Sequence, residues 1–142
     1  MSTLIAPATA NRQVGRSVFA ITAALVVNAV LSLGTDQVLH VLDIYPPWGQ
    51  PMYDASLNLL ALTYRIVFGV AAGYFVARLA PRAPMRHAAI LGIIAVALST
   101  LGAVAAITQA DLGPAWYPIA LALVAYPCVW LGAIFQRRLA AR

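Results

Sequence analysis

Four long stretches of apolar residues, separated by short polar segments, dominate the pattern of this chain. The stretches cover 17–35, 55–77, 87–110 and 112–136, and Arg65 is the one formal charge inside them. A helix needs about 20 mostly apolar residues to cross the hydrocarbon core of a bilayer. We therefore predict helices at about 15–40, 55–80, 87–109 and 115–137, all within a single transmembrane domain that covers residues 1–142.

The segment between the first two predicted spans, residues 43–54, has a different character. It reads DIYPPWGQPMYD, and its three prolines and one glycine prevent a continuous helix. Aromatic side chains near these helix ends prefer the headgroup region of a membrane; they are Tyr45, Trp48, Tyr53, Trp116 and Tyr117. We predict an outer loop that either caps the bundle or simply connects two helices along the membrane surface.

The charged residues divide between the two sides of the predicted bundle. All nine basic residues are arginine and all four acidic residues are aspartate. Eight arginines flank the N-terminus, the link between the second and third spans, and the C-terminus: Arg12, Arg16, Arg78, Arg82, Arg86, Arg137, Arg138 and Arg142. The acids lie in or beside the other two connections: Asp36, Asp43, Asp54 and Asp111. Because arginine-rich segments stay in the cytoplasm, we predict an up-down topology with both termini cytoplasmic.

Composition supports a membrane location. Hydrophobic residues make up 63% of the chain and charged residues 9%, against about 25% charged in an ordinary soluble domain. A soluble protein with so little charge would expose large apolar patches and aggregate. We predict an all-α, integral membrane four-helix bundle of a bacterial inner membrane, with the lipid bilayer as its partner. The membrane-flanking arginines account for the net charge of +5, so nucleic acid is not an expected partner.

Arg65 is the exception to the charge division. It precedes Arg78 by 13 residues, which places it about 20 Å from the inner surface. An arginine near the centre of a membrane helix costs roughly 2.5–3.5 kcal/mol, so we expect a partner. Polar residues at four-residue spacing form one face of the first helix, and Asn58 shares a face with Arg65. The predicted polar cluster is Asn28, Asp36, His40, Asn58 and Arg65, centred on an Asp36–Arg65 ion pair.

Two roles for this polar cluster remain open. In the first, the pair only fixes the register of two helices, or Arg65 extends to water beside Asp54. In the second, the cluster lines a ligand or ion site that opens outward. Ionisable residues inside membrane segments often mark functional sites.

The sequence offers little for catalysis. His40 and His87 are expected on opposite sides of the membrane, and the single cysteine, Cys128, allows neither a disulfide nor a cysteine metal cluster within the chain. Glycine-rich phosphate loops and the H-E-x-x-H motif are absent from the sequence. We predict a protein that is not an enzyme, with no catalytic residue, no metal site and no cofactor.

Small residues gather on two predicted helices and favour close helix packing. They are Gly69 and Gly73 on the second helix, and Gly92, Ala95, Ser99, Gly102 and Ala106 on the third. The leading interpretation is a small non-catalytic accessory or assembly subunit of a larger membrane complex, or a homo-oligomer. The alternative is a transporter or receptor for a small polar or anionic ligand, with an outward-facing site around Arg65 and Asp36.

Overall fold

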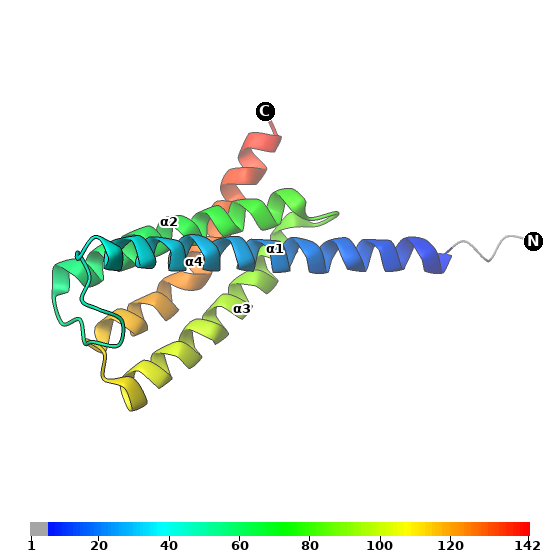
Figure 1. The fold of residues 1–142 in the computed structure, drawn as a ribbon. Helices are drawn as coiled ribbons and strands as arrows, with labels where there is room; N and C mark the ends of the chain where they lie inside the picture. The colour runs from blue at the N-terminus through cyan, green and yellow to red at the C-terminus, as the bar shows by residue number, and fades with distance from the viewer. Residues whose placement is uncertain (1–5) are drawn as a thin grey trace, which may run out of the picture.

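Four long helices account for most of residues 6–142, the part of the chain that this computed structural model describes (Figure 1). They are α1 (Ala6–Val41), α2 (Ala55–Leu79), α3 (Pro84–Ala105) and α4 (Trp116–Ala140). A short π-helical turn, η1 (Ala106–Ala110), extends α3. The four apolar spans have 25 residues or more, and the span on α3 continues into η1 as far as Thr108. These lengths exceed the about 20 residues that a membrane crossing needs. Helices of this length and composition indicate a multi-pass membrane protein.

The outer surfaces of the helices are apolar, as lipid contact requires. Phe19 on α1, Leu101 on α3 and Leu123 on α4 are 65%, 68% and 72% exposed. In water such a surface would drive aggregation. In a bilayer these side chains meet lipid tails as apolar as themselves, so the exposed apolar surface fits a bilayer environment.

α1 is longer than the apolar pattern predicts. It begins at Ala6 instead of near residue 15, and its 36 residues extend over about 54 Å. The polar stretch before the span contains Pro7 in the first helical turn, where a missing N–H costs no hydrogen bond. α1 therefore projects beyond the other helices at its N-terminal end (Figure 1).

α2 and α4 form the most extensive helix pair, while α1 packs mainly on α2 and α3 mainly on α4. Two glycines permit the close approach of the central pair. A Cβ atom on Gly73 would overlap the carbonyl of Val129, and one on Gly132 would overlap the carbonyl of Val70. Missing side chains at these two positions let the backbones touch.

The small-residue faces predicted on two helices are used between helices of the same chain. A Cβ atom on Gly69 would lie 3.1 Å from the Cβ of Cys128 on α4. On α3, a Cβ atom on Gly92 would lie 2.6 Å from the ring of Tyr126, also on α4. α4 is therefore the partner of the α2 face and of the Gly92 end of the α3 face, whereas a Cβ atom on Gly102 would meet nothing within 4 Å.

A core of mostly small residues lies at one end of the bundle. We call it the termini end, because the 80–83 link, the C-terminal half of α4 and the first packed residues of α1 lie there. Its buried members are Ala20, Ala24, Ala72, Val76, Ala77, Ala88, Leu91, Val129 and Ala133. The opposite end, here called the loop end, carries the 42–54 segment and the 111–115 connection. The loop end holds the candidate site.

Candidate functional site

An ion pair joins α1 to α2 near the loop end. The Nη2 of Arg65 lies 2.5 Å from Oδ2 of Asp36, and the two side chains are 28% and 9% exposed. The helical spacing that made Asp36 a candidate partner therefore does bring its carboxylate to this arginine. The pair lies inside the bundle, where low dielectric strengthens its attraction.

Tyrosines from two helices complete the hydrogen bonding of this pair. Tyr64 donates its hydroxyl to Oδ1 of Asp36, and Nη1 of Arg65 donates to the hydroxyl of Tyr117 on α4. The hydroxyl of Tyr45, from the 42–54 segment, lies 3.5 Å from that of Tyr64. From here on, the polar cluster means the ion pair and these three tyrosines. It shares Asp36 and Arg65 with the cluster predicted from the sequence.

Sequence reasoning missed these tyrosine roles. Tyr45 and Tyr117 were expected among the headgroups, yet Tyr45 is only 5% exposed and Tyr117 is half-buried with its hydroxyl on Arg65. Tyr64 carried no signal beyond its position next to Arg65. The adjacency of Tyr64 and Arg65 is the one signal that could have been used, because a buried hydroxyl needs a partner.

His40 lies near the pair and contacts aromatic rings. Its ring centroid is 4.0 Å from that of Trp48 and 5.5 Å from that of Tyr45. Its buried Nδ1 atom has no hydrogen-bond partner among the described residues. His40 thus joins the site through ring packing.

Asn58 and Asn28 make no hydrogen bond to the ion pair among the described residues, but each lines a cavity together with Arg65. Asn58 is 2% exposed, and its Nδ2 donates to the carbonyls of Met52 and Asp54 at 2.9 and 2.8 Å. This amide therefore anchors the end of the 42–54 segment to α2. Asn28 is half-buried on α1 and lines a second, deeper cavity.

The 42–54 segment covers the loop end and is tied to neighbouring elements. The Met52 N–H donates to the Leu112 carbonyl at 2.7 Å, and the Tyr53 hydroxyl donates to Oδ1 of Asp111 at 2.9 Å. Nε1 of Trp48 donates to Oε1 of Gln37 on α1 at 3.1 Å. Of the two predicted roles for this segment, the capping one fits these contacts.

Ionisable groups of this segment reflect their surroundings. Burial raises the pKa of the Tyr45 hydroxyl, and the hydrogen bond to Asp111 raises that of Tyr53. Asp54 caps the N-terminus of α2 by accepting from the Ser56 side chain and from the Ser56 and Leu57 N–H groups, and these hydrogen bonds lower its pKa. The ionised form of Asp54 is therefore part of the local fold.

Two cavities meet at Arg65. The loop-end cavity has a volume of about 430 Å³ and lies between the 42–54 segment and all four helices. The inner cavity, of about 260 Å³, lies deeper among the helices and is lined by Asn28 and Ser32. Arg65, Ser99 and Leu121 line both cavities, so the ion pair stands at their junction.

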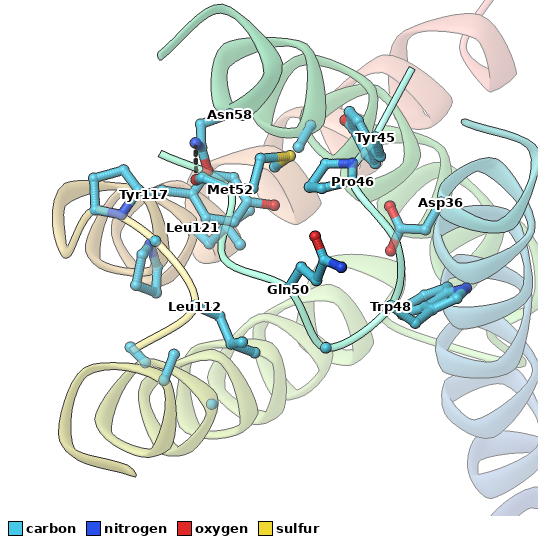
Figure 2. A pocket seen from close by; sticks show the side chains of 18 of the residues that line it. Asp36, Tyr45, Pro46, Trp48, Gln50, Met52, Asn58, Leu112, Tyr117 and Leu121 are labelled. Atoms are coloured by element: carbon cyan, nitrogen blue, oxygen red, sulfur yellow. Dashed lines mark hydrogen bonds between the residues drawn. The ribbon is translucent and has the colours of Figure 1, made fainter. Parts of the chain in front are cut away.

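The walls of the loop-end cavity are largely apolar and aromatic (Figure 2). Figure 2 shows the Asp36 carboxylate directed from α1 toward the cavity, with Trp48 close by and Gln50 on the covering segment. Leu112 and Leu121 form part of the opposite wall. A largely apolar hollow with a few converging polar groups is the usual form of a small-molecule site.

The chain matches no protein-family model, no curated protein and no solved structure. The chemistry of the site therefore has to be argued from its own residues. In the part of the chain that the structure describes, no three His, Cys, Asp or Glu side chains gather in one place. The groups that do gather are a guanidinium, a carboxylate and phenolic hydroxyls, which suit polar or anionic molecules.

Proposed function

We propose that this multi-pass membrane protein is a receptor or transporter for a small polar or anionic ligand. The ligand binds in the loop-end cavity, at the polar cluster formed by Asp36, Arg65 and the three tyrosines. The observation that carries the proposal is the 430 Å³ cavity whose wall includes that ion pair. Cavities of about 300–1,000 Å³ with a small number of placed polar groups are typical of small-molecule sites.

Arg65 has donors to offer such a ligand. A guanidinium carries five N–H groups, and the described residues engage Nη1 and Nη2 once each. The side chain is 28% exposed, and it lines both cavities. A carboxylate or another planar acceptor can therefore approach it from within the cavity.

The accessory-subunit or homo-oligomer function draws less support from the packing. It relied on small-residue faces that would be free for another chain. Gly69, Gly73 and Gly92 are in contact with α4 of the same chain, so within these two faces only the part of α3 around Gly102 is open. An accessory role in a larger complex is thus the outcome that a failed binding test would favour.

We further propose an up-down bundle in a bacterial inner membrane with both termini in the cytoplasm. Arginine-rich segments flank the termini end, and Asp43, Asp54 and Asp111 lie at the loop end. Under the positive-inside rule the loop end then faces outward, so the ligand enters from outside the cytoplasm. A C-terminal fluorescent-protein or alkaline-phosphatase fusion tests this orientation, because only the first is active in the cytoplasm.

No catalytic step is included in the proposal. A nucleophile has to lie beside an oriented base, and His40, the only histidine expected at the outer side, packs against aromatic rings. The ligand is therefore proposed to leave chemically unchanged.

The binding test is a thermal-unfolding assay of the protein in lipid nanodiscs with benzoate, acetate and inorganic phosphate. A ligand at about 100 times its Kd stabilises the folded state by about 2.7 kcal/mol. We expect stabilisation of the natural protein and of Arg82→Gln, which removes an exposed arginine from the 80–83 link. Arg65→Gln should abolish it. Equal stabilisation of the Arg65→Gln variant, or no response to any anion together with co-purification in a larger complex, contradicts the proposal.

A further inference from the structure

The Asp36–Arg65 pair makes the polar wall of the loop-end cavity electrically neutral. With side chains 9% and 28% exposed, the two charges are compensated mainly by each other. An anion that approaches such a pair meets one attractive and one repulsive group at nearly the same distance. Binding of the proposed anionic ligand therefore requires a change in the charge of Asp36 or Arg65.

Ionisable groups reach this pair from three helices and from the covering segment, as follows: His40 on α1, Tyr64 on α2, Tyr117 on α4 and Tyr45 from the 42–54 segment. α3 and η1 contribute Ser99, Gly102, Ala103, Ala106 and Ile107 to the cavity wall, none of which ionises. Tyrosine hydroxyls ordinarily stay protonated near neutral pH. Asp36 is thus the carboxylate that pairs with Arg65, and a proton bound to it would cancel its charge.

A bound carboxylate competes with Asp36 for the same guanidinium. Carboxylates and guanidinium groups form strong paired hydrogen bonds, so the ligand can replace Asp36 as the partner of Arg65. Two negative charges would then share one positive charge away from water, which is costly. A proton on Asp36 removes the excess charge, and the neutral carboxyl can still accept a hydrogen bond from Tyr64.

The residues that line the cavity limit which anions fit the site. Trp48, Leu112 and Leu121 favour an apolar body, and one guanidinium compensates one negative charge. An ion with two charges, such as phosphate near neutral pH, would leave a charge uncompensated. The geometry thus favours a monocarboxylate with an apolar or aromatic body.

Building on the proposed function, we infer that the protein binds an apolar monocarboxylate at Arg65 together with one proton on Asp36. The carboxylate takes the place of Asp36 on the guanidinium, and the proton comes from water that enters at the loop end. One anion and one cation are added, so the occupied site carries the same net charge as the empty one.

The test is a calorimetric titration of the full chain in nanodiscs with benzoate, in two buffers of different ionisation enthalpy. The difference between the two heats counts the protons taken up. We expect close to one proton per benzoate, and an affinity that is lower at about pH 7.5 than at about pH 5.5, by up to about tenfold for each unit of pH. Benzamide, which has the same ring but no charge, should show neither effect.

Variants separate this coupling from binding of neutral benzoic acid, which would also take up a proton. Asp36→Asn should bind benzoate with no proton uptake and no change in affinity with pH. Asp43→Asn is the matched control, because Asp43 is exposed and its φ of 56° suits asparagine; it should behave as the natural protein. Tyr64→Phe removes the donor that holds the ionised Asp36 carboxylate, so benzoate should bind severalfold more tightly near neutral pH.

Each outcome decides between the two proposals. Benzoate binding without proton uptake, or with one proton still taken up by Asp36→Asn, overturns the coupling and leaves the ligand site in place. If Asp36→Asn does not fold, unchanged or weaker benzoate binding by Tyr64→Phe overturns the coupling instead. If acetate or phosphate stabilises the protein and benzoate does not bind at either pH, the ligand class is wrong. Absence of binding by every anion removes the proposed function as well.

Discussion

The termini end and the loop end of this bundle are built from the same four helices but packed in opposite ways. At the termini end, alanines and glycines bring α2 and α4 into backbone contact and leave a buried core without polar side chains. At the loop end, Arg65 and Tyr117 stand between the helices beside the loop-end cavity. The inner cavity continues from Arg65 to the edge of the termini-end core, where Ala24, Ala72, Leu91 and Val129 line it.

Side-chain size and polarity account for this difference. Where a helix presents glycine, its neighbour approaches until the backbones touch. Where it presents arginine and tyrosine, the neighbours stand further apart, and the polar groups must find partners inside the bundle. The termini end is therefore held by close helix contacts, and the loop end keeps a cavity beside its polar groups.

The largest expected effect comes from breaking the ion pair at the loop end. Arg65→Gln leaves the Asp36 carboxylate buried without its counter-charge and should cost about 3–5 kcal/mol of folding free energy. Adding Asp36→Asn to this variant should restore most of the loss, since no unpaired charge then remains. Reversible unfolding in mixed micelles measures both. Additive losses in the double variant would show that the two residues act independently.

A single added methyl group is expected to disrupt the close packing of α2 and α4 at the termini end. Gly132→Ala places a Cβ atom against the Val70 carbonyl, which forces α2 and α4 apart and should cost about 1–3 kcal/mol or more. Gly34→Ala is the control, because a Cβ atom at Gly34 meets nothing within 4 Å. That control should change stability by about 1 kcal/mol or less. Equal stability of the two variants would contradict the close α2–α4 contact.

A smaller loss of stability is expected when one hydroxyl of the polar cluster is removed. Tyr117→Phe deletes the acceptor of the Arg65 Nη1 hydrogen bond and should cost about 1 kcal/mol. Tyr126→Phe, also on α4, serves as the control; its ring stacks on Trp130, and no hydrogen bond engages its hydroxyl among the described residues. Thermal unfolding in nanodiscs compares the two. Equal losses of stability in the two variants would show that the Arg65–Tyr117 hydrogen bond does not stabilise the fold.

The smallest expected effect is a pH dependence at the start of α2. Because the pKa of Asp54 is lowered by its capping hydrogen bonds, its contribution to stability is present above the pKa of the unfolded chain. It is lost as the pH falls through the lower, folded-state value. Asp54→Asn keeps the cap without the charge, so the stability difference between the natural protein and this variant should shrink on acidification. A difference that grows instead would contradict the assigned cap.

The spans and the ion pair could be predicted because each depends on a local pattern. A run of apolar residues is read directly from the chain, and four-residue spacing puts Asp36 on one face of its helix. Arg65 needed a polar partner wherever the bundle placed it, since an unpaired arginine in hydrocarbon is costly. The beginning of α1 was missed because its first turns lie outside the apolar pattern.

The sequence by itself determined the number of spans, their apolar surfaces and the presence of a charged pair inside the membrane, because these follow from hydropathy and helical periodicity. The packing of the helices sets which tyrosines join the pair, which groups Asn58 and His40 contact, and where cavities remain. Those outcomes depend on how closely and at what register helices distant in the chain meet. Side-chain sizes on both partners set that approach together, and neither helix encodes it alone.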